Sequence, residues 1–227
     1  MIQSQSARRL PGTLALCGVL AATTLSACAP LIVGGAAATT AVVVTDRRTA
    51  GTQLEDQSIA IKVDSAEAQH FGDRARINAS AYQHRVLLTG DVPNQTDKDE
   101  ATRVAQGVEN VKEVINQLNI GPPASFSERS GNSWLASKVR TTLINTRDVP
   151  SRTITVTAER GVVYLMGRVT QHEGNLAAAA AASVSGVREV VKLFEILTPE
   201  EAARLAEEQR KAETKRQQES QAETITP

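Results

Sequence analysis

The chain is poor in aromatic residues and carries no excess of either charge. Phe, Trp and Tyr make up 3% of the 227 residues, so a folded core must consist mainly of aliphatic side chains. The 25 Lys and Arg residues balance 25 Asp and Glu residues, and the formal net charge is zero. Binding to the nucleic-acid backbone depends on an excess of basic side chains. The composition therefore gives no support for nucleic acid as a partner.

Charged residues are also missing from most of the N-terminal region. Arg8 and Arg9 are the only ones before Asp46, and a short apolar run follows them at residues 14–20. This run has the length of a signal-peptide hydrophobic region and is short for a membrane span. The region therefore predicts export from the cytoplasm.

A four-residue motif closes this region. Leu25-Ser26-Ala27-Cys28 resembles the lipobox of bacterial lipoproteins, in which the cysteine thiol receives a diacylglyceryl group and the chain is cut before it. We therefore predict a signal peptide at 1–27 and lipidation, including palmitate, at Cys28. The residue after Cys28 is Ala29 and not aspartate. In enteric-type lipoproteins, a residue other than aspartate at this position implies export to the outer membrane. The alternative is an ordinary secretory signal with an incidental cysteine.

Cysteine is scarce, and neither copy is left free. Cys17 is removed with the predicted signal peptide and Cys28 carries the lipid, so no thiol pair remains for a disulfide or a cysteine metal site.

Two or three acyl chains make membrane attachment stable, whereas one chain holds only marginally. The mature chain of 200 residues is long enough for one medium domain or two small ones.

An internal repeat organises most of the mature chain. Residues 86–92 return at 163–169 with the pattern apolar-x-Gly-x-Val, and residues 107–111 return at 186–190 with the pattern Gly-Val-x-x-Val. Pro122 and Pro123 interrupt regular structure between the copies. The predicted parts are a lipid-anchored stalk at 28–55, a first domain at 56–120, a linker at 121–131, a second domain at 132–197 and a tail at 198–227.

Both copies have the same order of predicted elements. Helices are expected at 59–69, 97–106, 134–145 and 173–185, with alternating strands between and after them. The order αββαβ predicts an α+β fold in which each domain is a three-stranded sheet with two helices on one face. Gly90 and Gly167 are expected where a neighbouring element comes close, and Gly107 and Gly186 as left-handed helix caps. The charged tail is expected to be either helical or disordered.

The sequence shows no pattern typical of an enzyme. The three histidines lack further ligands at metal-binding spacing, and a structural zinc site needs about four convergent ligands. It contains no nucleophile elbow, phosphate-binding loop or His-Glu-x-x-His motif. We therefore expect no catalytic residues, no metal and no cofactor.

The helix expected to open the second domain has apolar residues on two sides. At 100° per residue, Leu135, Val139 and Leu143 form a core stripe, while Trp134 and Ile144 fall on the far side. Tryptophan and isoleucine beside cations are typical of a helix in a membrane interface. The predicted phospholipid-binding residues are Trp134, Lys138, Arg140, Thr141 and Ile144. The alternative is that Trp134 packs against the linker or the first domain.

Charge is distributed unevenly between the two copies. Residues 56–120 have a net charge of −3 and residues 132–197 a net charge of +3, with Arg147 and Arg152 near the helix. Each cation near an anionic membrane contributes about 1 kcal/mol to binding. The asymmetry favours the second domain as the membrane-binding one, unless it reflects chance variation between two solvated surfaces.

Taken together, these features resemble a known family. The doubled unit resembles the BON domain of bacterial envelope proteins, and with the lipobox and the segment Asp46-Arg47-Arg48-Thr49 the chain is similar to dual-BON outer-membrane lipoproteins of the DolP type. The resemblance implies a non-enzymatic protein on the periplasmic face of the outer membrane that binds phospholipid through the opening helix of its second domain and supports membrane integrity.

The expected partners are anionic phospholipids such as phosphatidylglycerol and cardiolipin. The alternative is a protein-interaction adaptor that uses the same helix to contact outer-membrane assembly proteins or cell-wall partners.

The lipobox interpretation predicts that Cys28→Ala abolishes metabolic labelling with palmitate, because the thiol that receives the lipid is removed. The variant should accumulate as a soluble or uncleaved protein. Labelling that persists in the variant would contradict the assignment of Cys28.

Overall fold

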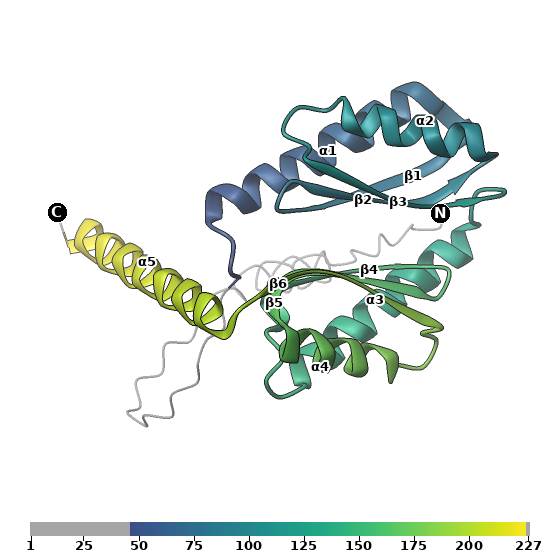
Figure 1. Cartoon of the computed structure of the whole chain (residues 1–227). Helices are drawn as coiled ribbons and strands as arrows, with labels where there is room; N and C mark the ends of the chain where they lie inside the picture. Colours follow the sequence, from purple (N-terminus) through teal and green to yellow (C-terminus); the bar gives the residue numbers. More distant parts are fainter. Residues whose placement is uncertain (1–45, 226–227) are drawn as a thin grey trace, which may run out of the picture. The chain divides into compact units, whose positions relative to one another are not determined.

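The structure, a computed structural model, describes residues 46–225. The predicted signal peptide at 1–27, Cys28 and most of the stalk at 28–55 therefore lie outside the described residues. The described part contains two domains with the element order αββαβ, followed by a C-terminal helix (Figure 1). This order confirms the α+β fold class expected from the sequence.

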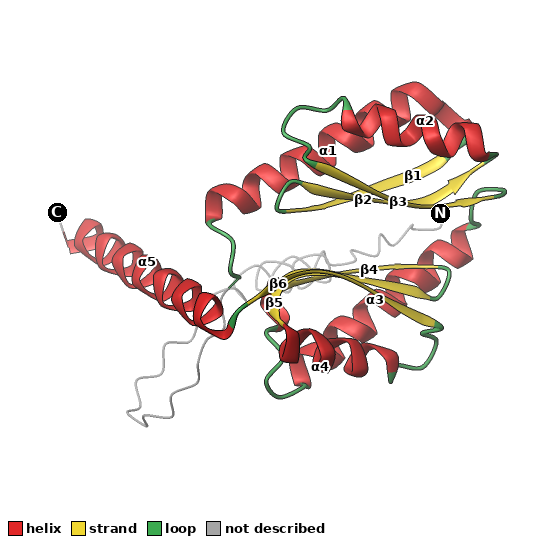
Figure 2. Cartoon of the chain, in the orientation of Figure 1, coloured by secondary structure: helices red, strands yellow, loops and turns green. Residues whose placement is uncertain are grey.

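The first domain is a three-stranded sheet with both of its helices on one face (Figure 2). Strands β1 and β2 form an antiparallel hairpin, and α2 crosses over to β3, which is parallel to β2. The sheet order is β1-β2-β3. The elements are α1 (Ala50–Phe71), β1 (Arg76–Tyr82), β2 (Arg85–Val92), α2 (Gln95–Gln106) and β3 (Glu113–Ile120).

The second domain repeats this topology with the sheet order β4-β5-β6. Its elements are α3 (Phe126–Asn145), β4 (Ile154–Glu159), β5 (Val162–Thr170), α4 (Gln171–Ala182) and β6 (Glu189–Leu197). The tail that follows is helical, forming α5 (Pro199–Ile225), and Lys211 pairs with Glu207 at 2.7 Å on its surface.

Both opening helices begin earlier than the sequence analysis expects. Helix α1 begins at Ala50 because the hydroxyl of Thr49 accepts a hydrogen bond from the amide of Thr52. Helix α3 begins at Phe126, inside the predicted linker, because Ser125 and Glu128 form a capping box. The added turns are mostly polar, so they carry little of the apolar periodicity on which the prediction depends.

Each hairpin is closed by a two-residue turn with positive φ at both positions, the geometry that matches strand twist. The turn residues are Gln83 and His84 in the first domain and Arg160 and Gly161 in the second. The opening helix binds each turn, since Asp56 accepts hydrogen bonds from both amides of the first at 2.9 Å and Asn132 accepts one from Arg160 at 2.9 Å. Asp56 and Asn132 are therefore equivalent positions, 76 residues apart.

The central strands are buried on both faces. Their helix-facing side chains are Val86, Leu88 and Val92 in β2 and Val163, Leu165 and Val169 in β5. Side chains on the other face form a third cluster that draws on both domains and contains Tyr82, Leu87, Tyr164 and Met166. The two sheets therefore pack against each other, a contact that the sequence analysis did not predict.

Ion pairs beside this apolar contact converge on Asp91. Its carboxylate is fully buried and binds Arg76 of the first domain and Arg160 of the second, each at 2.9 Å. It also accepts a hydrogen bond from the amide of Ala124 in the connection between the domains, at 2.9 Å. A buried carboxylate requires such partners. Asp91 therefore links both domains and the chain between them.

The segment that precedes α1 also contacts both domains. Arg47 is buried and forms a bidentate ion pair with Glu173 at the start of α4, with both distances 2.8 Å. Burial alone would raise the pKa of Glu173, but the hydrogen bonds from Arg47 help to lower it below its ordinary value. Arg48 pairs with Asp56 of the first domain at 2.9 Å and lies 4.1 Å from the ring centroid of Tyr82.

The two Gly-Val-x-x-Val motifs are not structurally equivalent. The amides of Lys112 and Arg188 each bind the hairpin turn of their own domain, so these two residues are structurally equivalent. They are 76 residues apart, whereas the two motifs are 79 residues apart in the sequence. Gly107 ends α2 with a right-handed φ of −74°, and Gly186, with φ of 101°, lies beyond the end of α4. The prediction of left-handed glycine caps is therefore wrong, because the amide of Gly107 bonds to carbonyls three and four residues back and closes the helix in a right-handed turn.

Valine at position 90 or 167 is expected to destabilise the chain by about 1–3 kcal/mol, as overpacking of a close contact does. A Cβ atom at Gly167 would lie 2.6 Å from the carbonyl oxygen of Thr153. At Gly90 it would overlap the carbonyl oxygen of Arg76, and the φ of +127° there adds strain. Thermal denaturation measures the effect, and unchanged melting of both variants would contradict these placements.

Glu67 in α1 is a buried acid of a different kind. The residue is 1% exposed, and neither carboxylate oxygen has a hydrogen-bond partner among residues 46–225. Burial raises the pKa of Glu67 to about 8, and the nearby charges of Asp64 and Glu100 add to the increase. Glu67 is therefore protonated in the folded chain at neutral pH.

This buried acid predicts that stability falls as the pH rises. The folded chain keeps the proton of Glu67 up to about pH 8, whereas the unfolded chain releases it near its ordinary pKa of 4.5. Each unit of this pKa difference corresponds to about 1.4 kcal/mol. Urea denaturation at a series of pH values should show this loss in the wild-type chain and a much smaller one in Glu67→Gln. Equal slopes in both chains would show that Glu67 is not the group responsible.

Candidate functional site

Helix α3 carries all five residues predicted to bind phospholipid. Leu135, Val139 and Leu143 are buried in the core of the second domain. Trp134 and Ile144 are 66% and 64% exposed, on the side of the helix away from that core. The helix is therefore apolar on two opposite sides, one of which meets solvent in the isolated chain.

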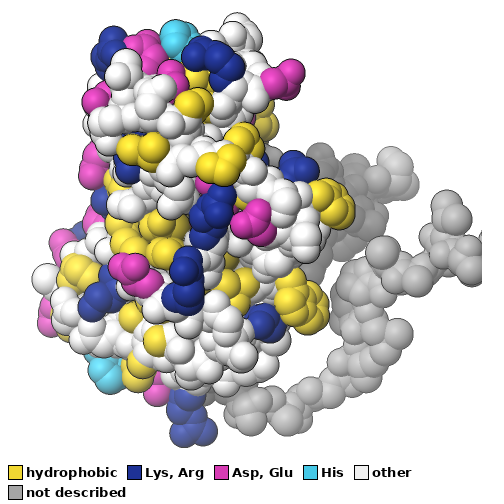
Figure 3. Space-filling view, turned by 90° about the vertical axis from the view of Figure 1, so that its right-hand side faces the viewer, with side chains coloured by type: hydrophobic (Ala, Val, Ile, Leu, Met, Phe, Trp, Pro, Cys, Tyr) yellow, Lys and Arg dark blue, Asp and Glu magenta, His cyan; other side chains and the backbone are white. Residues whose placement is uncertain are grey.

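Trp134 borders an open groove between α3 and the loop that follows α4. This tryptophan groove, with a volume of about 500 Å³, is lined by Trp134, Ser137, Lys138, Thr141, Thr142, Ser183, Val184 and Ser185. The ammonium of Lys138 donates a hydrogen bond to the carbonyl oxygen of Ser185 at 2.5 Å. Figure 3, which views the molecule from the right-hand side of Figure 1, shows hydrophobic and basic side chains next to one another on the face that it presents. Among residues 46–225, no carboxylate lines the groove.

Three of the five predicted residues line this groove, and two do not. Trp134, Lys138 and Thr141 lie along it. Arg140 donates a hydrogen bond to the carbonyl oxygen of Val156 in β4 at 3.2 Å, so its guanidinium is engaged at the sheet. Ile144 is exposed farther along the helix and does not line the groove.

Phe126, which is 76% exposed at the start of α3, is not among the residues predicted from the sequence. Phe126 and Ile144 are 18 residues apart, which corresponds to five helical turns, so they lie on the same side of the helix. The sequence does contain a signal for the true start of the helix, the capping-box pair Ser125 and Glu128. This pair would have placed Phe126 at the first position of the helix.

Comparison with known proteins assigns the chain to a family. Residues 55–122 and 131–198 each match the family model of the BON domain. Over 175 residues the chain is 42% identical to the outer membrane lipoprotein DolP of Haemophilus influenzae. The aligned region covers 76% of this chain and 90% of that protein. The chain belongs to the BON-domain family. It is a dual BON-domain lipoprotein, and its similarity to DolP assigns it a lipid-anchored location in the outer membrane.

Two further relatives are less similar to the chain. The 21 kDa hemolysin of Actinobacillus pleuropneumoniae is 32% identical over 66% of this chain and 78% of that protein. The osmotically inducible protein Y of Escherichia coli is 32% identical over 62% of this chain and 72% of that protein.

The described BON domains offer neither a membrane span nor a metal site. Within residues 46–225, no helix is long and apolar enough to cross a membrane. The same residues contain no group of three or more His, Cys, Asp or Glu side chains arranged to hold a metal ion. The BON family is not known as an enzyme family.

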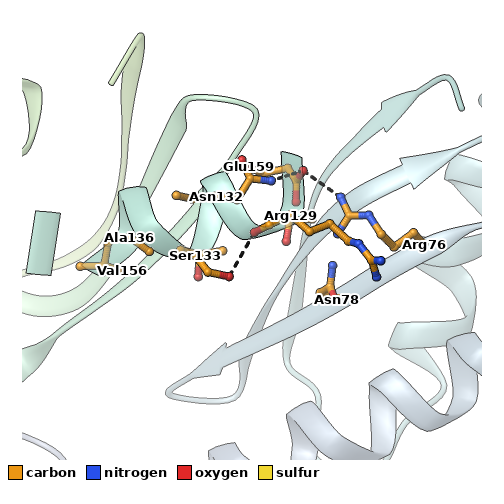
Figure 4. Close-up of a pocket in the computed structure, with 11 residues that line it drawn as sticks. Arg76, Asn78, Arg129, Asn132, Ser133, Ala136, Val156 and Glu159 are labelled. Carbon is orange, nitrogen blue, oxygen red and sulfur yellow. Dashed lines mark hydrogen bonds and ion pairs between the residues drawn. The ribbon is translucent and has the colours of Figure 1, made fainter. Parts of the chain in front are cut away.

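A second pocket lies between the two BON domains. It has a volume of about 290 Å³ and is lined by Arg76 and Asn78 of the first domain and by Arg129, Asn132 and Glu159 of the second, among others. Figure 4 shows Arg76 and Arg129 extending into the same space, while Glu159 binds both Arg76 and Asn132 at 2.8 Å. None of the predicted phospholipid-binding residues lines this pocket.

Proposed function

We propose that the second BON domain binds anionic phospholipid through the outward side of α3, and that this contact supports the integrity of the envelope. The exposure of Trp134 and Ile144 opposite the helix core, next to Lys138, carries this proposal. Tryptophan is favoured at the headgroup level of a bilayer because its ring is amphipathic. A helix with an apolar side and flanking cations binds at the same depth.

The lipid anchor strengthens the case for lipid over other ligands. An outer-membrane lipoprotein is already held at a bilayer, so a second contact with that bilayer is intramolecular in effect. A weak individual site is then enough to orient the domain on the membrane. Loss of the site would change how the protein is oriented and where it gathers, while the anchor would still retain it.

The first domain provides an internal comparison. With the offset of 76 residues, Ser58 occupies the position of Trp134 and Ala68 that of Ile144. Helix α1 still exposes Leu54 and Ile61, by 69% and 62%, so apolar exposure alone does not distinguish the domains. Charge does distinguish them, since the first domain is net acidic and the second net basic. Anionic lipid therefore favours the second domain.

The central prediction is that Trp134→Glu removes binding to vesicles that contain phosphatidylglycerol or cardiolipin. A glutamate at the interface would oppose both the apolar contact and the anionic surface. Flotation with the lipid-free fragment 46–227 measures binding without the anchor, and wild-type binding should weaken at high salt because the charges are screened. Since Trp134 is exposed, the melting temperature should be nearly unchanged. Ser58→Glu, at the equivalent position of α1, is the matched control and should still bind.

Two outcomes would contradict this proposal. Unfolding of Trp134→Glu would show that the side chain packs within the protein. Undiminished vesicle binding by a folded Trp134→Glu variant would place the lipid contact elsewhere, and α3 would then be better explained as a surface for an outer-membrane assembly protein or a cell-wall partner.

A further inference from the structure

A second groove adjoins the tryptophan groove and shares Lys138 with it. This basic groove has a volume of about 560 Å³ and is lined by Glu128, Gly131, Asn132, Leu135, Lys138, Arg160, Gly161, Gly186 and Arg188. Three cations and one carboxylate line it. Because Lys138 belongs to both linings, an apolar groove and a cationic groove meet at one ammonium group.

The cations of the basic groove differ in how far they are already neutralised. Arg160 pairs with Asp91 and with Glu128, at 2.9 and 3.2 Å. Lys138 and Arg188 bind only backbone carbonyl oxygens, and neither has a carboxylate partner within the described part of the chain. Two positive charges at the groove are therefore available to an anion.

Two glycines lie beside these side chains, and one of them allows Arg188 to occupy its position. A Cβ atom at Gly161 would lie 2.6 Å from Nε of Arg188, so the glycine lets the arginine lie across the hairpin turn. A Cβ atom at Gly186 would lie 3.7 Å from Nζ of Lys138, an ordinary van der Waals contact, so space alone does not require glycine there. Both glycines also have positive φ, which favours glycine over other residues.

The first domain lacks this arrangement, although it retains basic residues at the corresponding positions. Lys62 is equivalent to Lys138, because the two are 76 residues apart. Lys112 is equivalent to Arg188 at the same spacing, and the amide of each binds the hairpin turn of its own domain. In the first domain, however, Glu109 pairs with Lys62 at 3.2 Å. Its equivalent in the second domain is Ser185, which has no charge.

We infer that the basic groove binds the phosphate of the lipid whose apolar part lies at the tryptophan groove, with Arg188 and Lys138 as its ligands. This inference rests on the proposed function and specifies the headgroup chemistry at that site. Guanidinium and ammonium groups donate charge-assisted hydrogen bonds to phosphate oxygens. A ligand that joins an anion to an apolar group and occupies both grooves is a phospholipid rather than a free anion.

The test compares Arg188→Gln with Lys192→Gln in the lipid-free fragment 46–227, the compact part of the chain. Each variant removes one positive charge from the second domain, but Lys192 lies on β6 beside Asn175 of α4 and does not line either groove. Affinity is measured by the change in Trp134 fluorescence on titration with phosphatidylglycerol vesicles. We expect Arg188→Gln to weaken binding about tenfold, the loss of one charge-assisted contact, and Lys192→Gln much less.

Ser185→Glu provides a second test that leaves Arg188 in place. The new carboxylate reproduces Glu109 of the first domain beside Lys138, so it should also weaken binding. Circular dichroism confirms that each variant is folded.

The outcomes separate this inference from the proposed function. If the wild-type fragment binds and Arg188→Gln and Lys192→Gln lose equally little affinity for the vesicles, the phosphate site is wrong. The proposed contact through α3 would still stand. Absence of wild-type binding would overturn the proposed function itself. Inorganic phosphate at constant ionic strength should displace the vesicles poorly, because it lacks the apolar part. Complete displacement by millimolar phosphate would identify the groove as a site for the free anion and overturn the assignment to lipid.

Discussion

The buried carboxylate of Asp91 is the contact on which the arrangement of the two BON domains depends. It binds an arginine from each domain and an amide of the short connection between them, with no exposure to solvent. Removal of one partner from such a group leaves an uncompensated buried charge, which is strongly destabilising. The ion pairs and the apolar cluster around Tyr82 and Tyr164 together fix one sheet against the other. Much of the free face of each sheet is buried in this contact, which leaves the outward sides of the helices exposed to solvent.

Duplication of one fold then leaves two candidate surfaces, and substitutions at equivalent positions make them different. Where α1 has Ser58, α3 has Trp134, and where the first domain has Glu109, the second has Ser185. The first change adds an exposed aromatic ring, and the second leaves Lys138 without a carboxylate partner in the part of the chain that the structure describes. Both changes favour an anionic, amphipathic ligand at the second domain. The first domain contributes the acidic surface and half of the interface that holds the second domain in place.

The sequence was sufficient to predict the αββαβ order, the two sheets and the apolar side of α3 opposite its core, because periodicity and a repeat specify these locally. It was not sufficient for features that depend on contacts distant in the chain. The position of Arg140 on the helical projection does not reveal that its guanidinium binds the carbonyl of Val156. The match between residues 107–111 and 186–190 is genuine as sequence but misleading as structure, since the hairpin contacts set an offset of 76. The packing of the sheets did leave a signal: residues 86–88 and 163–166 are continuously apolar, as expected for strands buried on both faces.

The most direct test of the account is the depth of Trp134 in a membrane. The chain contains a single tryptophan, so fluorescence quenching by brominated phospholipids in vesicles reports on α3 alone. With the lipid-free fragment 46–227 and vesicles rich in phosphatidylglycerol, we expect a shift of the emission to shorter wavelength and strongest quenching by bromine near the headgroups. Vesicles of zwitterionic lipid should produce little of either effect. A tryptophan whose emission stays unchanged and unquenched while the fragment floats with anionic vesicles would contradict the assignment of α3 as the lipid-binding surface.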